Sequence, residues 1–459
     1  MKLPDGPQAP VWLETLQFVL RPIEYLEARQ KRYGDAFTIG RNTDSPVVYL
    51  SHPQAIEEIF TADRNLFDVG RGSKPLLEPL LGEQSLGVLD GQSHQRLRRL
   101  LLPPFHGERM RAYSQLISKI AQQVLSGWTI GKAFPVRSSM QEITLRVILQ
   151  AIFGINQGQR YDLLRELLST FVDSISSPLN AAQLFFPAMR QDLGAWSPWG
   201  QFVRLRKQII QLLIDEIEER RQQPIEEERT DILTLLLMTV DETGQPLTDA
   251  ELRDQLLTLL FTGHETTATA LAWALYWIHY LPEVKSKLLD EIGTIDADAD
   301  LSAIARLPYL TAVVSETLRI YPVGLATPSR ILNSPLQIGD FQFNPGTVLV
   351  PCIYLTHQRE DLYPEPKHFQ PERFLERQFS PYEYFPFGGG NRSCIGMAFA
   401  QFQMKLVLAT LLRNLDLDLA SGHSIKPVRR GPTLAPSDNL HLIVKDRHPV
   451  LHQKALAAL

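Results

Sequence analysis

The sequence predicts a mainly α-helical protein with small β-sheets, and three observations lead to this prediction. Apolar residues recur at three- and four-residue spacing from about Ser93 to Leu281, as on helices with one buried face. One candidate helix, Thr248–Leu281, would be roughly 50 Å long, enough to cross a whole domain. Strand-like runs are few and short.

The first 90 residues hold most of the expected N-terminal β-structure. A β-branched and aromatic run in 37–53 predicts a hairpin, and residues 53–61 have a helical pattern. Residues 91–330 form the helical part. Its longest helix starts at a capping box, Thr248-x-x-Glu251, and stops before Pro282. A charged break is expected at 221–230, and a helix at Tyr309–Ile320.

Residues 331–459 are expected to begin with short strands and to end with a long helix. Strand-like runs lie within 335–351, a glycine-rich loop at 388–390, and a helical pattern near 397–415. We expect residues 1–459 to form a single domain from these three parts.

The composition limits the classes of function. The chain has 459 residues, 44% of them hydrophobic, so it can bury a large core without disulfides. Its net charge of −5 gives no reason to expect nucleic-acid binding. The only cysteines, Cys352 and Cys394, exclude a disulfide framework and a four-cysteine zinc or iron–sulfur site.

The N-terminal region shows no membrane anchor or signal peptide. The apolar stretch 11–20 is too short to span a bilayer and contains Glu14. We expect a cytoplasmic monomer.

The segment Phe385–Ala400, FPFGGGNRSCIGMAFA, has the features that a thiolate metal ligand needs. Glycines allow the backbone to approach a flat cofactor. A following helix and the nearby Arg392 would lower the pKa of the Cys394 thiol. The alternative is that Cys394 is a small core residue, the usual fate of a free cysteine.

The pattern Phe387-x-x-Gly390-x-Arg392-x-Cys394-x-Gly396 resembles the haem-binding loop of the cytochrome P-450 family. The resemblance extends from about residue 4 to residue 444. It implies the cytochrome P-450 fold, with haem b between a long central helix and the cysteine loop. Cys394 would be the axial ligand of the iron, and the other four motif residues would contact the cofactor.

Further family marks occur in the expected order. Glu316-x-x-Arg319 and the later Arg373 resemble the charged cluster that supports the cysteine loop, a structural role. In the long helix, the resemblance places a bend that makes room for dioxygen at Gly263. Glu265 and Thr266 match the family's catalytic acid–alcohol pair, which would supply protons for O–O cleavage.

The propionates of a haem need donors. The resemblance assigns this contact to His94, Arg98, Arg330 and Arg392. Arg96 and Arg99 are expected to face solvent and to form part of a basic patch for an acidic electron donor. His264 has no second histidine at metal-ligand spacing, and Cys352 lies in an apolar run, so we expect both to be core residues. Thr262 stands where the family usually has alanine or glycine.

The resemblance implies a monooxygenase that inserts one atom of dioxygen into a C–H bond. No fused reductase is expected, so a ferredoxin and a ferredoxin reductase would supply the electrons. One alternative is a peroxide-using or rearranging member of the family, and another is a non-enzymatic haem sensor or carrier. Members without the acid–alcohol pair are typical of the first alternative.

Four segments are expected to line the substrate site: 67–87, 169–189, 323–329 and 431–439. They are apolar, which suits a lipophilic ligand. The overall sequence is similar to cyanobacterial members that act on fatty acids and terpenes, so we expect a fatty acid or a terpenoid. The candidate lining residues are Phe171, Leu184, Phe185, Phe186 and Leu325.

Overall fold

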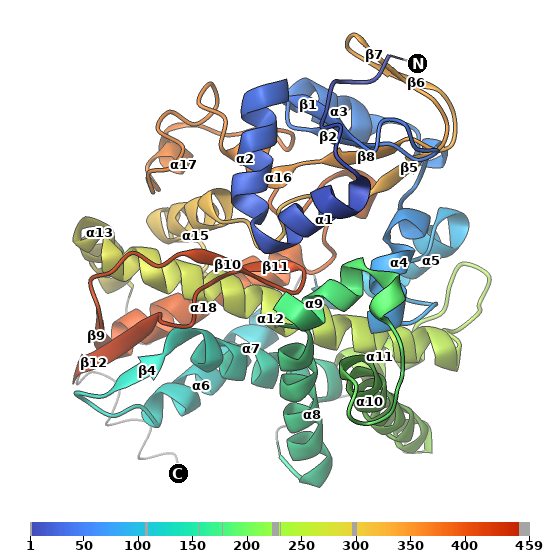
Figure 1. Ribbon diagram of the computed structural model, residues 1–459. Helices are drawn as coiled ribbons and strands as arrows, with labels where there is room; N and C mark the ends of the chain where they lie inside the picture. The colour runs from blue at the N-terminus through green and yellow to red at the C-terminus, as the bar shows by residue number, and fades with distance from the viewer. Residues whose placement is uncertain are drawn as a thin grey trace.

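The computed structural model describes residues 2–105, 109–155, 157–176, 178–222, 229, 231–295 and 301–448. Helices make up most of this part of the chain, and the strands gather at its upper end and along one side (Figure 1). The mainly helical prediction is confirmed. The α-helices are α1 (Val11–Leu20), α2 (Pro22–Tyr33), α3 (Pro53–Thr61), α4 (Val69–Leu81), α5 (Gly91–Leu101), α6 (Arg109–Ser126), α7 (Val136–Phe153), α8 (Gln159–Ser176), α9 (Pro178–Phe185), α10 (Pro198–Gln222), α11 (Ile232–Met238), α12 (Asp249–Tyr280), α13 (Pro282–Gly293), α14 (Leu301–Ile304), α15 (Pro308–Ile320), α16 (Ile353–His357), α17 (Arg373–Glu376) and α18 (Met397–Asn414).

The strands are short and belong to small sheets. They are β1 (Ala36–Ile39), β2 (Val47–Leu50), β3 (Phe67–Asp68), β4 (Ala133–Pro135), β5 (Arg330–Leu332), β6 (Leu336–Ile338), β7 (Phe341–Phe343), β8 (Val348–Pro351), β9 (Leu415–Leu419), β10 (Pro427–Arg430), β11 (Thr433–Pro436) and β12 (His441–Arg447). Single 3-10 turns are η1 (Arg64–Leu66), η2 (Pro103–Phe105), η3 (Pro187–Met189) and η4 (Gly390–Arg392).

The largest sheet joins the two ends of the sequence. Its order is β1-β2-β8-β5-β3, with β1 and β2 as the antiparallel hairpin expected within 37–53. Strand β8 runs parallel to β2 and antiparallel to β5. The sheet therefore ties the first 70 residues to the segment that leads into the cysteine loop (Figure 1).

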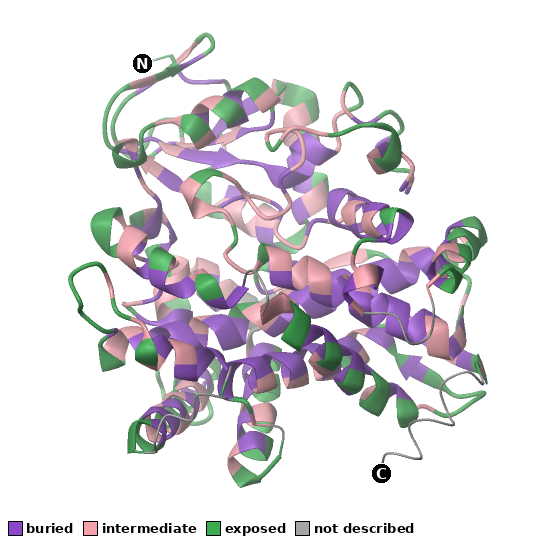
Figure 2. Ribbon diagram, turned by 180° about the vertical axis from the view of Figure 1, so that it is seen from behind, coloured by how far each residue is buried: buried purple, intermediate pink, exposed green. Residues whose placement is uncertain are grey.

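Helix α12 is the central element of the helical part, as the sequence predicts. Thr248 and Glu251 form both hydrogen bonds of the capping box, and Pro282 begins the next helix. Most of its side chains are buried, and Figure 2 shows the long helix crossing the middle of the molecule as a largely buried element. It packs against α7, α18 and the β10–β11 hairpin. Trp273 is fully buried and donates its indole N–H to the carbonyl of Leu434, 3.0 Å away.

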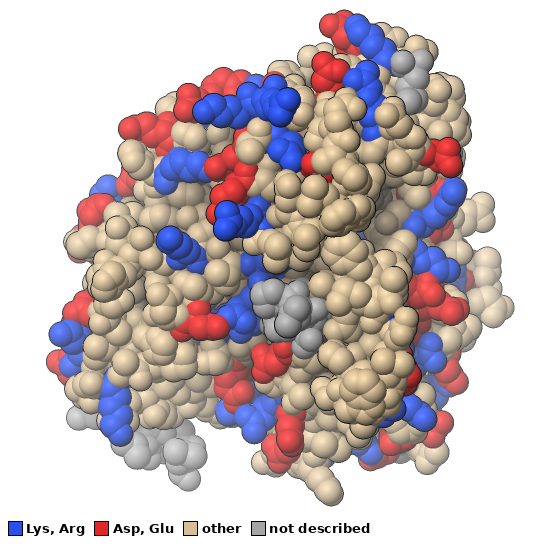
Figure 3. Space-filling view, in the orientation of Figure 1, with Lys and Arg blue, Asp and Glu red and all other residues tan. Residues whose placement is uncertain are grey.

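Helix α1 covers the expected apolar stretch 11–20. Its Glu14 is buried and accepts hydrogen bonds from Arg29 and from the Tyr25 hydroxyl at 2.8–3.1 Å. Within the described ranges, no helix has both the length and the apolar character that crossing a bilayer requires. Acidic and basic side chains are interspersed on the face that Figure 3 shows, without a large field of either sign.

Candidate functional site

A cavity of about 350 Å³ lies between α12 and the cysteine loop. Gly263 and Thr266 contribute the α12 wall, Phe387 and Cys394 the opposite wall, and Phe399 of α18 one end. Most of the remaining lining is apolar. This apolar part comprises Phe105, Ile148, Leu259, Ala270, Leu318, Val323, Ala326, Pro328, Ile353, Pro386, Ile395, Ala400 and Met404, and polar residues that also line the cavity are Thr262, Thr267, Thr327 and Arg392. The cavity suits a large apolar group that reaches the sulfur of Cys394.

The cysteine loop is shaped by its glycines. The amide of Cys394 donates to the carbonyl of Phe387 and that of Gly388 to Phe385, both over 2.9 Å. Gly388 and Gly390 have φ values of 69° and 64°, the left-handed region that favours glycine. A Cβ at Gly389 would lie 2.2 Å from the Phe60 ring. The glycine run is therefore required by the backbone path and by the contact with α3.

The Cys394 thiol opens into the cavity, just before the start of α18. Burial raises its pKa, while the backbone N–H of Gly396 and the guanidinium of Arg98 act in the opposite direction. The expected lowering by the following helix is present but is outweighed by burial, and the cation that acts on the thiol is Arg98 rather than the expected Arg392. Bound metal would supply the missing stabilisation, because a coordinating thiol is deprotonated by the ion.

Arg98, expected at a propionate, contacts the cysteine loop directly. From α5 it donates to the carbonyl and the hydroxyl of Ser393, at 2.8 and 3.0 Å. It does not line the cavity that Cys394 lines. Arg98 thus fixes the residue before Cys394 and places positive charge near the sulfur.

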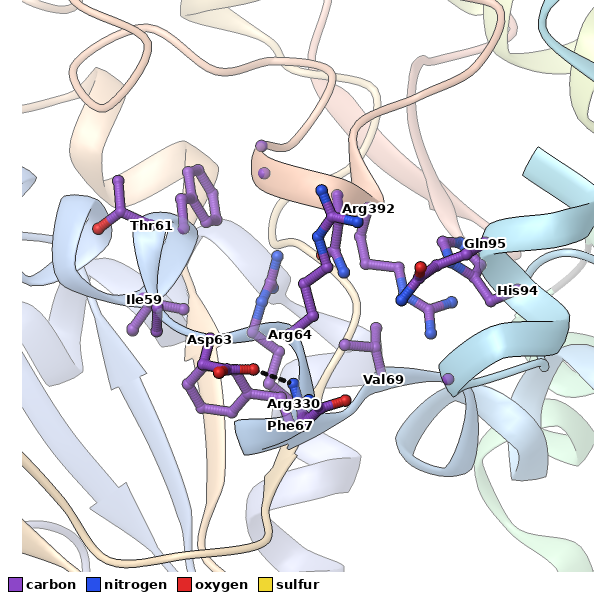
Figure 4. A pocket seen from close by; sticks show the side chains of 17 residues that line it. Ile59, Thr61, Asp63, Arg64, Phe67, Val69, His94, Gln95, Arg330 and Arg392 are labelled. Carbon is purple, nitrogen blue, oxygen red and sulfur yellow. Dashed lines mark hydrogen bonds between the residues drawn. The ribbon is translucent and has the colours of Figure 1, made fainter. Parts of the chain in front are cut away.

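A second cavity, of about 370 Å³, adjoins the first and is lined by His94, Arg330, Gly390 and Arg392 (Figure 4). Arg392 lines both cavities. Arg330 is buried, and among the described residues its hydrogen bonds go to the Thr327 hydroxyl and the Pro328 carbonyl. Burial lowers its pKa to about 10, and the nearby Arg392 contributes. In the described part of the chain no carboxylate neutralises Arg330, so this cavity favours an anion.

His94 acts in this cavity as a neutral donor rather than a cation. Its side chain is buried, and burial, Arg392 and Arg98 lower its pKa to about 3. A neutral imidazole can still donate one hydrogen bond. An anion bound beside it would raise the pKa again.

Arg392 has a partner that the sequence did not reveal. It donates to the carboxylate of Asp90 at 2.5 Å and to the carbonyl of Leu89 at 2.7 Å. The same carboxylate accepts the backbone N–H groups of residues 69–71 at the start of α4. Asp90 therefore fastens the start of α4 to the cysteine loop. From its position just before α5, Asp90 would have been predicted to cap α5. Its carboxylate instead accepts the N–H groups at the start of α4.

The α12 turn at 262–267 places Thr266 on the cavity. Its hydroxyl donates to the carbonyl of Thr262 at 2.7 Å, which leaves its oxygen free to accept a bond. Thr262 also lines the cavity and donates to Thr258. A Cβ at Gly263 would lie 2.8 Å from the Ile148 side chain on α7. Close helix packing thus gives a second reason for this glycine, besides the expected bend.

Glu265, the other half of the expected pair, points away from the cavity. Its carboxylate accepts from Arg137 at 2.7 Å and from Gln141 at 2.6 Å, both on α7. It does not line the cavity that Thr266 lines. The structure therefore brings Thr266, but not the Glu265 carboxylate, to the space above Cys394.

The charged cluster Glu316–Arg319–Arg373 forms as expected. Arg319 bonds both oxygens of Glu316 at 2.6 and 2.8 Å, and Arg373 bonds one at 3.3 Å. Arg319 also donates to the carbonyl of His357. The His357 ring in turn accepts the N–H of Phe385, at the start of the cysteine loop. One buried histidine thus joins this charged cluster to the loop.

Two expected core residues are confirmed. Cys352 is fully buried, and burial raises its thiol pKa to about 12. His264 is buried and its ring bonds the carbonyl of Leu260. Among the described residues no group of three or more His, Cys, Asp or Glu side chains could hold a metal ion.

The expected basic patch is largely neutralised. Arg96 is not a free surface charge, because it pairs with Asp241 at 2.5 Å and with Glu251 at 2.7 Å. Arg99 is exposed as expected, but it pairs with Glu242. The prediction of a basic patch from these two residues is therefore wrong.

The five candidate substrate residues lie outside the cavity lining. Phe171 is fully buried and stacks on Phe202, and Leu325 belongs to the core around Cys352. Of the four expected segments, 323–329 alone contributes to the cavity. Part of segment 169–189 lies outside the described residues. Tertiary packing, which hydrophobicity cannot reveal, places Phe171 and Leu184 in the main core, with Phe185 packed against it.

The residues present fit a haem. An apolar cavity holds a thiol in one wall, and the adjoining cavity offers anionic groups the guanidinium of Arg330, which has no carboxylate partner among the described residues. This donor set matches a flat apolar ring with one thiolate ligand and two carboxylates. Four-cysteine and histidine-cluster metal sites do not fit the described residues.

Comparison with known proteins gives one consistent family. The "Cytochrome P450" family model matches residues 4–444. The putative cytochrome P450 135B1 of Mycobacterium tuberculosis is 35% identical over 97% of this chain and 92% of its own length. The putative cytochrome P450 138 of the same species is 33% identical over 97% of both chains.

Solved structures agree with this result. A retinoic acid-bound cyanobacterial CYP120A1 has a TM-score of 0.83 and 28% identity, covering 98% of this chain and 100% of the other. The haem domain of cytochrome P450DA has a TM-score of 0.82 at 23% identity, covering 97% and 98%, which shows a shared fold. The cavity, the cysteine loop and these matches together establish that the chain belongs to the cytochrome P450 family of haem-dependent monooxygenases.

Proposed function

We propose that this monooxygenase holds haem b through Cys394 and oxidises a C–H bond of a fatty acid or a terpenoid. The observation that carries the proposal is the Cys394 thiol, which opens into an apolar cavity opposite Thr266. When bound, the haem supplies the activation of dioxygen for insertion of one oxygen atom. The side chains of the protein would position the haem and deliver protons.

Three sets of residues would position the haem. Cys394 provides the axial thiolate, and Phe387, Gly390 and Gly396 shape the loop around it. Arg330 and Arg392, with His94 as a neutral donor, would bind the propionates. Arg98 would support the loop through its bonds to Ser393, and its N–H groups that do not bond Ser393 would reach a propionate.

Thr266 and Glu265 have separate roles in this proposal. The Thr266 hydroxyl donates its hydrogen bond to the carbonyl of Thr262, so its oxygen can accept a hydrogen bond from a water in the cavity. Glu265 would accept protons from the α7 side and deliver them after its side chain turns from Arg137. The presence of the pair favours dioxygen over peroxide as oxidant, and it argues against a rearranging enzyme or a haem sensor.

The substrate class rests on the cavity and on one relative. The walls beyond Cys394 are apolar, from Val323 to Pro328. The similar cyanobacterial protein was solved with retinoic acid, an isoprenoid carboxylic acid. A long apolar carboxylic acid has features of both expected substrate classes, the carboxylate of a fatty acid and the apolar skeleton of a terpenoid. We also propose that electrons come from a separate ferredoxin and its reductase.

The first test is an optical titration of the purified ferric protein with palmitic acid, retinoic acid and farnesol. A ligand that displaces the iron-bound water shifts the Soret band to the high-spin position. We expect a saturable shift with at least one class, and an oxygenated product of that ligand when ferredoxin, reductase and dioxygen are added. Absence of a shift with all three, in protein that shows the thiolate spectrum, would contradict the substrate class. Binding without product would favour a haem sensor or carrier.

A further inference from the structure

Arg429, on β10, is a partly buried cation in an aromatic setting. Its guanidinium carbon lies 4.5 Å from the ring centroid of Phe18 on α1 and 5.4 Å from that of Phe185 on α9. Burial lowers its pKa to about 10, so it remains charged at neutral pH. Figure 1 shows β10 running across the front of α12, with α1 above it and α9 beside it.

The donors of Arg429 are largely unused. Its Nε is shielded from solvent and has no hydrogen-bond partner. One long bond, 3.3 Å, joins a terminal nitrogen to the carbonyl of Phe18. In the described ranges no carboxylate pairs with Arg429, whereas its neighbour Arg430 pairs with Asp438. Leaving a partly buried cation without an anion is costly.

A neighbouring arginine does not share this feature. Arg190, near the same end of α9, donates to the carbonyls of Gln183, Leu184 and Pro75 at 2.6–2.9 Å. Backbone oxygens thus satisfy Arg190. Arg429 combines a charge, burial and spare donors.

Tyr49 lies against the same Phe18 ring as Arg429, with the two ring centroids 6.3 Å apart. Its ring stacks on Phe37 with centroids 5.0 Å apart, which fixes its direction on β2. No hydrogen bond of its hydroxyl is found among the described residues, and the charge of Arg429 acts on it. Arg429 and Tyr49, one charged and one neutral donor, therefore both pack against the Phe18 ring.

The β10–β11 hairpin connects this place to the haem cavity. Arg429 is directly opposite Leu434 in the ladder. The N–H of Leu434 donates to the carbonyl of Val323 at 3.0 Å, and Val323 lines the cavity. Paired strands lie about 5 Å apart. Arg429 is therefore one strand away from Leu434, which is hydrogen-bonded to the cavity-lining residue Val323.

We propose that Arg429 and Tyr49 bind the carboxylate of the substrate, so that its apolar chain runs past the β10–β11 hairpin to the cavity. The proposal rests on the proposed function, whose lipophilic substrate it narrows to a long-chain carboxylic acid. A guanidinium and a phenol can together donate several bonds to one carboxylate. Low local polarity strengthens such bonds. The competing account is that Arg429 serves only as a cation–π contact that fastens α1 and α9.

The experiment compares acids with alcohols of the same skeleton in matched variants. Palmitic acid is paired with hexadecanol, and retinoic acid with retinol, which separates the fatty from the isoprenoid source. Arg429→Met removes the charge and keeps the length of the side chain. Arg430→Met makes the same change on the next residue, whose charge already has a partner. Dissociation constants come from the Soret shift, and the rise of the melting temperature with ligand gives a second readout.

We expect Arg429→Met to weaken acid binding about ten- to a hundredfold, the range for losing a charged hydrogen bond. Alcohol binding should change by less than about threefold, Arg429→Lys should restore part of the loss, and Tyr49→Phe should give a smaller one. Arg430→Met should leave both ligands unchanged. At the same acid concentration the melting temperature should rise less in Arg429→Met than in the parent protein.

Two other results have distinct meanings. Equal losses for acid and alcohol in Arg429→Met, with a lower melting temperature, would overturn the proposal and leave the structural contact. If the parent protein binds the alcohols but not the acids, the carboxylate site is refuted while the proposed function survives. If it binds no lipophilic ligand by either readout, the proposed function fails first.

Discussion

Two clusters of buried charge contact the cysteine loop, and they are built differently. In the cluster of Glu316, Arg319 and Arg373, a carboxylate and backbone carbonyls meet the guanidinium groups. In the cluster of His94, Arg330 and Arg392, only Arg392 is paired with a carboxylate, that of Asp90, while Arg330 has none among the described residues and His94 is kept neutral. The first cluster is complete within the chain. The second provides donors that an external anion can use.

The difference separates structural from functional charge. Burying a charge without a partner costs free energy, so a cluster that supports the fold should be satisfied internally. A cluster that binds a ligand leaves a buried charge unpaired in the ligand-free protein, and the ligand offsets this free-energy cost when it binds. Substitutions in the first cluster should therefore lower the stability of the protein with and without haem. Substitutions in the second cluster should mainly weaken haem binding.

The largest effect is expected for Glu316→Gln. The change leaves Arg319 and Arg373 buried without their carboxylate, which should lower the free energy of unfolding by about 3–5 kcal/mol. Urea denaturation followed by circular dichroism measures this, in protein with and without haem. A loss below about 1 kcal/mol, or one confined to the haem-loaded form, would remove the distinction between the clusters.

Arg330→Leu should have the opposite pattern. In haem-free protein it should leave the free energy of unfolding nearly unchanged or raise it, because a buried cation without a carboxylate is removed. Haem binding should weaken by about 1.5–3 kcal/mol, through loss of a charged hydrogen bond to a propionate. The rate of haem transfer to apomyoglobin gives the second quantity. Destabilisation of the haem-free protein to the extent of Glu316→Gln would show that Arg330 is structural.

These two clusters also show what the sequence could predict. Glu316 and Arg319 are one helical turn apart, so their contact follows from spacing. Thr248 and Pro282 bound α12 because capping and stop signals are local. The cysteine loop was recognisable because five of its residues lie within ten positions.

Long-range contacts explain most of what was missed. Arg137 and Gln141 hold Glu265 across more than 120 residues, and Arg429 meets Phe18 across more than 400, distances at which no spacing rule applies. Helix α4 was not expected, because it contains Pro75 and Pro79. The Asp90 carboxylate satisfies the N–H groups at its start, and this contact is visible only in the folded chain.

His357 joins the complete cluster to the cysteine loop, and it should make that connection sensitive to acid. Burial and Arg319 lower its pKa to about 3, so below about pH 6.5 the unfolded chain takes up a proton that the folded chain refuses. The contribution is fully present above pH 6.5 and is lost as the pH falls toward 3. From pH 7.5 to 5.5 the loss should be about 1.4 kcal/mol. His357→Gln should lose that much less stability over the same range, measured by urea denaturation. Equal slopes for both proteins would contradict this role.

Thr266→Ala should affect stability least, because its hydroxyl bonds only a carbonyl within α12. Substrate binding and electron consumption should persist, while more hydrogen peroxide and less product are released. Peroxide and product are assayed per electron consumed, with Thr269→Ala, a buried threonine of α12 outside the cavity lining, as the control. Unchanged coupling in Thr266→Ala would remove this hydroxyl from the mechanism.

The central claim is that Cys394 is the axial ligand, and the chain offers a matched control in its only other cysteine. Cys394 opens into the cavity, whereas Cys352 is fully buried in another core. The measurement is the spectrum of the reduced, carbon monoxide-bound protein for Cys394→Ser and Cys352→Ser. We expect the red-shifted thiolate band to vanish in Cys394→Ser and to persist in Cys352→Ser. Retention of that band in Cys394→Ser, or its loss in Cys352→Ser alone, would contradict the account.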